Sequence, residues 1–485
     1  MYTDLKTWGA LLLYLCATAA AYAQTEQEPA ADPPNILWIY VEDQSPYFGC
    51  YGNAVNAGHT PNVDAIAQRG TLFERCYMPA PVCSPCRSAL ITGAMQTTLG
   101  LHNHRSSRHA SAQIALPEGV KPIPQLMQEA GYYTFNHGKE DYNFTFRMPD
   151  LYSANVRRGS PDASHPWRGR DDGQPFFGQI QLTGGKHWGA IRNGRRNLES
   201  PTDRDAVEVP AYFPDLPILQ EHFALHHDTA RVTDHEVGVI LDRLAQDGLL
   251  DNTVVFFFTD HGMNNSMRAK QFCYEEGVHV PLVIMWMGHE DRIAAGDRRD
   301  ELVSGLDISA TTFALAGLEA PAYFEGSDLF AQDHSPRSFV ISARDRCDYT
   351  IDRTRTVRTE RYRYIRHYLT DRAMLQPQYR DGADYFEVLR EAYEAGDVPD
   401  AAARMFAVPR PAEELYDMER DPLQLVNLAG DADYAQALGA HRDILSAWIE
   451  ATDDQGQYPE SEAGLRAVLR QWKDRCVNPE YNAVR

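Results

Sequence analysis

The sequence predicts an α/β protein with a large, mainly parallel mixed sheet flanked by helices. Three apolar runs, at 35–41, 175–182 and 253–259, are rich in β-branched and aromatic residues, as expected of strands buried on both faces. Between the last two runs, apolar residues recur at helical spacing from Phe223 to Gln246. Strands that alternate with helices in this way indicate parallel pairing through helical connections.

The first 23 residues have the pattern of a secretory signal peptide. Lys6 precedes an apolar run at 8–21, and Ala21-Tyr22-Ala23 offers small residues at a cleavage position. The run is short for a membrane span, and a polar linker follows at 24–34. We therefore expect a mature protein that is periplasmic or secreted and has no membrane-spanning segment.

The chain is strongly acidic. Its 46 lysines and arginines are outnumbered by 68 aspartates and glutamates, and the formal net charge is −22. Such a charge repels a phosphate backbone, which argues against a nucleic-acid partner. Of the eight cysteines, Cys16 falls in the signal peptide, and the others could form disulfides in an oxidising compartment in a pairing that the sequence does not specify.

Polar residues follow the predicted strands directly. Glu42-Asp43 comes after the first apolar run, Asp260-His261 comes after the third, and a further strand at 131–135 leads to Gly138-Lys139. Open α/β sheets place ligands at the carboxyl ends of their strands, although an acidic residue there can also simply cap a helix. Carboxylate oxygens with one imidazole suit a hard divalent cation.

A helix start is predicted within residues 81–93. Ser84 is a good N-cap and a proline follows it, so Cys83 is expected just outside the helix. The helix dipole and the Arg87 guanidinium favour an anion beside this cysteine. The spacing of Cys83 and Cys86 alone fits a redox pair or an ordinary disulfide equally well.

Several basic segments could contact an anionic substrate. The loop 102–109 is rich in histidine and arginine, and two long loops, at 151–175 and 188–215, are rich in glycine, proline, arginine and aspartate. They fit a solvated surface as well as a binding surface. The candidate substrate contacts are His104, Arg105, Lys186 and Arg268.

The last third of the chain predicts a smaller α+β domain containing an antiparallel sheet. Residues 356–365 alternate like one strand with a solvated face, Glu414 begins a short strand, and 435–451 predicts a closing helix. We expect a catalytic domain over 35–345 and this C-terminal domain over 346–485.

The cysteine stretch also resembles a family signature. Cys83-x-Pro85-x-Arg87, followed by Leu90 and Thr92-Gly93, is similar to the maturation motif of the type I, formylglycine-dependent sulfatases in the alkaline-phosphatase-like superfamily. The Gly-Lys-x-Asp-Tyr-Asn pattern at 138–143 resembles the sulfamidases and some marine polysaccharide sulfatases. The other matching segments are Asn35 to Asp43, Asp260-His261-Gly262, Lys270 to Leu282, and Glu414 to Leu428.

The resemblance implies an alkaline-phosphatase-like fold and a sulfuric ester hydrolase. A formylglycine-generating or sulfatase-maturing enzyme would oxidise Cys83 to Cα-formylglycine. One hydroxyl of the hydrated aldehyde would attack sulfur, and deprotonation of the second would release sulfate. Three cations would stabilise the sulfuryl oxygens, namely Arg87, Lys139 and Lys270. The implied ligands of Ca²⁺ are Glu42, Asp43, Asp260, His261 and the modified Cys83.

Three parts of the site depart from the family pattern or align within one residue of it. Glu42 stands where the family usually has aspartate. Asp141 replaces a histidine, so the base for sulfate release is either Asp141 or His137. The proton donor to the leaving group is either Lys186 or His187, of which we favour His187.

Together these features predict an exported sulfatase that acts on a sulfated carbohydrate, such as the algal polysaccharide ulvan or its oligosaccharides. The alternatives are a heparan-type N-sulfoglucosamine sulfohydrolase, a phosphate or phosphonate ester hydrolase of the same superfamily, and a glycan-binding relative without turnover. A disulfide-exchange protein is disfavoured, because it leaves no role for Arg87 or for the acidic strand ends.

Overall fold

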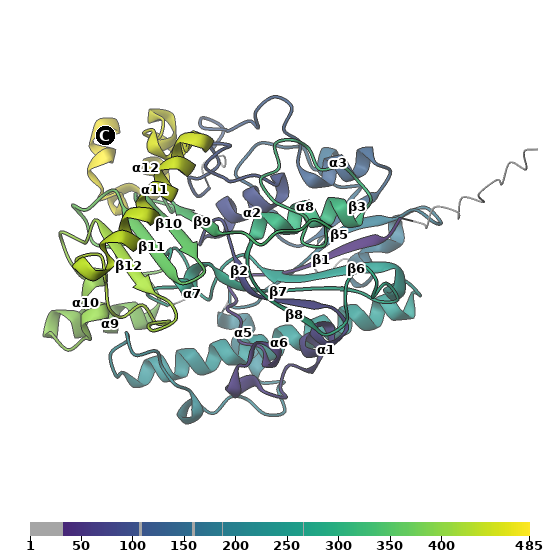
Figure 1. The fold of residues 1–485 in the computed structure, drawn as a ribbon, viewed down its shortest axis with the longest axis horizontal. Helices are drawn as coiled ribbons and strands as arrows, with labels where there is room; N and C mark the ends of the chain where they lie inside the picture. Colours follow the sequence, from purple (N-terminus) through teal and green to yellow (C-terminus); the bar gives the residue numbers. More distant parts are fainter. Residues whose placement is uncertain (1–32, 106–108, 158–160, 187, 265) are drawn as a thin grey trace, which may run out of the picture. The chain divides into compact units, whose positions relative to one another are not determined.

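Strand β1 (Asn35–Val41) lies in the interior of an eight-stranded sheet, and all of its residues are buried (Figure 1). The other strands are β2 (Thr71–Tyr77), β3 (Tyr133–His137), β4 (Ala154–Val156), β5 (Phe176–Leu182), β6 (Thr253–Thr259), β7 (His279–Trp286) and β8 (Asp297–Ser304). Their order is β4-β3-β5-β1-β6-β7-β2-β8. β7 runs antiparallel to both of its neighbours, whereas the other pairs are parallel. The predicted mainly parallel mixed sheet is therefore confirmed.

The computed structural model describes residues 33–105, 109–157, 161–186, 188–264 and 266–485, of which residues 34–485 form one compact unit. The expected signal peptide at 1–23 and nearly all of the linker at 24–34 lie outside the described residues, as does His187. Among the helices described, none combines the length and the apolar composition needed to cross a bilayer.

Helices cover both faces of the large sheet. Successive side chains of β1 point to opposite faces, so apolar side chains on both faces are buried by helices. Trp38 packs in the same cluster as Leu90 of α2 (Cys83–Thr92) and Ile308 of α8 (Gly305–Leu315). Ile39 instead packs with Ile240 of α6 (Pro217–Gln246), which confirms the predicted long helix. The other helices of this part are α1 (Pro61–Arg69), α3 (Ile123–Glu129), α4 (Met148–Leu151), α5 (Trp188–Arg195) and α7 (Glu275–Val278).

A second, antiparallel sheet is formed by β9 (Phe339–Arg344), β10 (Thr354–Thr359), β11 (Tyr362–His367) and β12 (Glu413–Asp417). The prediction of one strand over 356–365 is wrong, because a tight turn at Glu360-Arg361 divides it into β10 and β11. Alternation with period two continues across such a hairpin and hides the turn. β9 already precedes residue 346, where we expected the C-terminal domain to begin.

The second sheet packs close to the helix that carries Cys83. Val357 of β10 lies in one apolar cluster with Leu438 and Leu445 of α11 (Ala435–Thr452) and with Ala89 of α2. The buried face of α2 therefore touches both sheets. The remaining helices are α9 (Asp384–Ala395), α10 (Asp400–Phe406) and α12 (Glu462–Trp472).

Candidate active site

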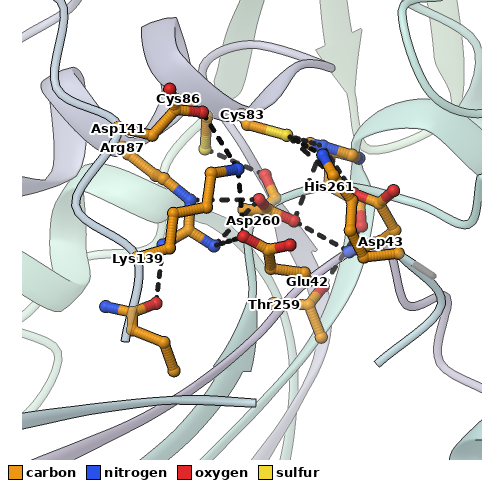
Figure 2. Close-up of polar contacts among 12 residues, drawn as sticks. Glu42, Asp43, Cys83, Cys86, Arg87, Lys139, Asp141, Thr259, Asp260 and His261 are labelled. Carbon is orange, nitrogen blue, oxygen red and sulfur yellow. Dashed lines mark hydrogen bonds and ion pairs between the residues drawn. The ribbon is translucent and has the colours of Figure 1, made fainter. Parts of the chain in front are cut away.

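Cys83 is the first residue of α2 and lies at the carboxyl ends of β1 and β6, with only 1% of its surface exposed (Figure 2). The predicted N-cap at Ser84 is wrong, since the helix begins after Val82. The Ser84 hydroxyl instead accepts a hydrogen bond from the backbone N–H of Arg105 at 3.0 Å. A proline is tolerated anywhere in the first turn, because the N–H groups there have no helical partner, so the sequence did not define the starting residue.

Four side chains around Cys83 bring possible metal ligands together. One ligand atom from each of Asp43, Cys83, Asp260 and His261 lies within 4.8 Å of the others, and all four residues are buried. The backbone of Asp43 is left-handed (φ 54°), and its N–H donates to Asp260 Oδ1 at 3.0 Å. This turn directs both carboxylates at one point.

The orientation of His261 fits a metal ligand. Its Nδ1 lies 2.9 Å from the carbonyl of Gly262, so Nδ1 carries the proton and Nε2 faces Cys83 Sγ at 3.3 Å. A ligating histidine is commonly oriented in this way by a carbonyl on its other nitrogen. Two carboxylates and one imidazole nitrogen are a donor set that a hard divalent cation accepts.

Glu42, the other expected ligand, does not belong to this group of four. Its Oε1 lies 2.9 Å from Lys139 Nζ and accepts a hydrogen bond from Arg87 Nη2 at 3.3 Å. Figure 2 shows Glu42 in contact with both of these cations, whereas Asp43 lies toward His261. The structure thus joins Glu42 to the cationic side of the site.

Arg87 is held rigidly from several sides. Its guanidinium donates to Asp260 Oδ2 from Nε (3.3 Å) and Nη2 (3.1 Å), and to Gln181 Oε1 from Nη1 (2.6 Å). It also lies 4.3 Å above the ring of Tyr40. Gln181 and Tyr40 were missed by sequence reasoning, although a polar Gln181 in the fully buried β5 is a recognisable signal.

Three lysines place positive charge around Cys83. Lys186 Nζ lies 3.3 Å from Cys83 Sγ, and Lys270 Nζ lies 2.6 and 2.9 Å from the Asp43 carboxylate oxygens. Burial opposes ionisation of the thiol, but Lys139, Lys186 and Lys270 together hold the pKa of Cys83 well below its ordinary value. Position 83 is thus a site built to stabilise negative charge.

The two candidates for a base lie in different places. Asp141 Oδ2 is 2.9 Å from Lys139 Nζ, which puts this carboxylate at the site. His137 lines a separate cavity of about 310 Å³ with Trp167 and Ile240, on the sheet face covered by α6. The geometry therefore favours Asp141 over His137.

The candidate substrate contacts separate in the same way. Lys186 touches Cys83, and Arg105 lies close by with 28% of its side chain exposed. His104 is buried, and its Nδ1 lies 3.5 Å from Asp348 Oδ1. The structure does not bring Arg268 to the site. Its guanidinium is buried elsewhere and joins helix α10 to the segment at 423–424, because it donates to the backbone carbonyls of Ala401, Leu423 and Gln424.

The cysteine pair is not joined in a disulfide. Cys83 and Cys86 are both free, as are the other cysteines of the described chain. Cys86 Sγ instead donates to the backbone carbonyl of Asp260 at 2.9 Å. This contact ties Cys86 to the backbone just after β6, whereas Cys83 faces the charged groups of the site.

Comparison with known proteins agrees with the geometry. A family model described as sulfatase matches residues 34–318, and the model of the C-terminal part of N-sulphoglucosamine sulphohydrolase matches 264–388. An ulvan-active sulfatase of Formosa agariphila is 28% identical over 470 residues, covering 88% of this chain and 77% of the relative. Human N-sulphoglucosamine sulphohydrolase is 25% identical over 472 residues, covering 87% and 91%.

A solved structure has the same fold. That structure is of a protein in complex with its substrate, D-glucosamine-2-N,6-O-disulfate. It is similar to this chain with a TM-score of 0.63 and 18% sequence identity. The likeness covers 87% of this chain and 98% of that one.

Proposed function

Because this chain belongs to the sulfatase family, we propose that it is an exported enzyme that hydrolyses sulfate esters of a sulfated carbohydrate, using a formylglycine made from Cys83 and a bound Ca²⁺. The observation that carries the proposal is the setting of Cys83, between a group of metal-type ligands and three lysines. Export is supported by the signal-peptide pattern of residues 1–23.

The residues present fit both groups. The calcium ion would be held by Asp43, Asp260, His261 and the modified residue 83. Glu42 lies beside this group and forms ion pairs with Arg87 and Lys139. When bound, the ion supplies positive charge next to the reacting oxygens. Formylglycine supplies, in its hydrated form, a hydroxyl nucleophile at the position that the Cys83 sulfur now holds.

The side chains of this chain have separate tasks in the reaction. Lys270 binds sulfuryl oxygens on the side of Asp43, while Arg87 and Lys139 hold charge on the side of Glu42. Their placement is fixed by buried carboxylates, so little reorganisation is needed when charge develops.

Proton transfers require an acceptor and a donor. Asp141 accepts the proton when sulfate is released, since it is the carboxylate next to Lys139. Lys186 or His187 donates a proton to the departing sugar oxygen, and the contact of Lys186 with Cys83 supports it as a candidate beside the favoured His187.

The substrate class follows from the relatives. The ulvan-active sulfatase covers most of this chain, so we propose ulvan or its oligosaccharides as the substrate, with an N-sulfated glucosamine glycan as the alternative. Both are sulfated carbohydrates.

The test is to co-express the chain with a maturing enzyme and measure sulfate release from ulvan oligosaccharides, N-sulfoglucosamine and aryl sulfates. Mass spectrometry of the peptide containing residue 83 must first show the loss of about 18 Da that marks formylglycine. Release from ulvan fragments is expected. Matured protein that frees no sulfate from any substrate contradicts the proposal, and release from N-sulfoglucosamine alone selects the alternative. Cys83→Ala is the inactive control.

A further inference from the structure

Tyr379 reaches the candidate active site from the connection between β11 and α9. Its phenol lies within electrostatic reach of Lys270, Lys186 and Cys83. The ionisation of Lys186 and that of Lys270 are in turn influenced by the phenol of Tyr379. The side chain is partly exposed, and within the described part of the chain its hydroxyl has no hydrogen-bond partner. A partly exposed phenol under the influence of two lysine charges is available to a ligand.

Other tyrosines in this region differ from Tyr379. The hydroxyls of Tyr274 and Tyr416 are buried and both donate to Glu414, at 2.9 and 2.5 Å. Their hydrogen bonds stabilise the fold and leave nothing for a substrate. Tyr379 therefore does not belong to this structural class.

The backbone around Tyr379 is firmly held. Gln378 and Arg380 on either side are buried, and the N–H of Gln378 donates to Asp381 Oδ2 at 3.0 Å. Arg380 Nε in turn donates to Gln378 Oε1 at 3.1 Å. Because the turn is already ordered, little conformational entropy is lost when Tyr379 contacts a ligand.

The ring of Tyr379 is supported from behind by His104. The two rings stack at 6.3 Å between centroids with an interplanar angle of 23°. His104 is oriented in turn by Asp348 and lies 3.7 Å from Cys347 Sγ. This chain of contacts fixes the direction in which the phenol points.

His104, Cys347 and Asp348 lie close enough to suggest a second metal site, but their surroundings argue against it. The Arg105 guanidinium is 3.8 Å from Asp348 Oδ1, and Arg346 donates to the backbone carbonyls of His104 and Asp348. A divalent cation placed there would be repelled by both arginines. The cluster is better explained as the support of Tyr379.

The direction of the substrate follows from burial. Arg87 and Asp260 are buried and close one side of Cys83, so a sugar attached to the sulfate must extend toward the partly exposed groups. Those groups include Lys186, Arg105 and Tyr379. A tyrosine phenol, with an ordinary pKa of about 10, is protonated at neutral pH and can donate a hydrogen bond.

We propose that Tyr379 is a specificity-determining residue that contacts the sugar on the leaving-group side of Cys83 and donates its hydroxyl hydrogen to a sugar oxygen. This inference rests on the proposed function, because it requires a sulfated sugar at Cys83. It also means that a residue outside the expected catalytic domain completes the site.

The first experiment compares Tyr379→Phe with wild type on a sulfated oligosaccharide and on an aryl sulfate, which has no sugar. Loss of one hydrogen bond is expected to lower kcat/KM for the oligosaccharide about tenfold, mainly through KM, and for the aryl sulfate about threefold at most. Tyr393→Phe, at an exposed tyrosine of α9, is the matched control and should change neither. An equal loss on both substrates, or less than a twofold loss on the oligosaccharide, overturns the inference.

A second experiment separates this inference from the proposed function, because it needs no turnover. Binding of a sulfated disaccharide is measured by calorimetry to Cys83→Ala and to Cys83→Ala combined with Tyr379→Phe. About tenfold weaker binding of the double variant supports the role of Tyr379 even if wild type releases no sulfate, in which case only the proposed function fails. Equal binding overturns the inference alone, and a protein that neither binds nor cleaves sulfated sugars overturns both.

Discussion

Replacing Arg87 by methionine removes the guanidinium that ties Asp260, Glu42 and Gln181 together. Four hydrogen bonds of 2.6 to 3.3 Å are lost, and the buried carboxylates of Asp260 and Glu42 lose a shared cation. Methionine has a similar length and still packs on the ring of Tyr40. The perturbation is therefore electrostatic and leaves the packing largely intact.

The expected magnitude can be estimated from these contacts. Removing one partner of a buried ion pair costs about 3–5 kcal/mol. The unpaired Gln181 carbonyl adds about 1 kcal/mol. A loss of about 4–6 kcal/mol is a large part of the free energy of unfolding of a typical protein, about 5–15 kcal/mol.

The assay is urea unfolding followed by tryptophan fluorescence, with a chelator present so that all variants are compared without metal. Arg87→Lys keeps one charge but loses the planar fork, so its loss should be intermediate. Arg147→Met removes an arginine that is 83% exposed and paired with Asp150, and should have no measurable effect. If Arg87→Met unfolds within about 1 kcal/mol of wild type, the desolvation of the guanidinium cancels its contacts and the reasoning is refuted.

Three further predictions follow from the same contacts. Ca²⁺ at one hundred times its Kd should stabilise the matured protein by about 2.7 kcal/mol, measured as a shift of the urea midpoint. Asp260→Asn should abolish this shift. A calcium response that survives in Asp260→Asn contradicts the assignment of Asp260 as a ligand. Burial opposes ionisation of Glu414, but hydrogen bonds from His367 and Tyr416 lower its pKa to about 2. The ionised carboxylate therefore contributes its full stabilisation above the unfolded pKa of about 4.5, and this stabilisation disappears as the pH falls from there toward 2. Glu414→Gln should therefore cost about 3 kcal/mol at pH 7 and much less at pH 3, and a cost that does not change with pH would show that another group causes the acid sensitivity. If Lys186 donates the leaving-group proton, Lys186→Ala should slow alkyl sulfates at least a hundredfold but aryl sulfates with acidic phenols only weakly, and equal slowing of both assigns the lysine to binding.

The main sheet and the strand ends could be predicted because their signals are local. A continuous apolar run such as 253–259 predicts a buried strand, and the acidic residue that follows it lies at the sheet's carboxyl edge by geometry alone. The same reasoning predicts that Glu42, Asp43 and Asp260 lie near one another, and the structure brings them together.

What could not be predicted depends on contacts between distant segments. The preference of Glu42 for Arg87 and Lys139 over the metal-type group results from the approach of β3 and α2, which are separate in sequence. Arg268 follows the pattern of a basic residue near the site, yet tertiary contacts bury it against α10 and the segment around 424. Tyr379 lies in a loop without a motif, so nothing in its neighbourhood marked it.

The scarcity of lysine gives the site a chemical handle. The chain has six lysines, and Lys139, Lys186 and Lys270 are gathered around Cys83. Apart from Lys6, in the expected signal peptide, only Lys121 and Lys473 remain to compete for an amine-reactive reagent. Coupling to an amine-reactive surface would therefore use Lys121, Lys473 or the chain's amino terminus. Because Lys270 is fully buried, a small amine-reactive reagent would report ligand protection of the two partly exposed central amines, Lys139 and Lys186, almost free of background.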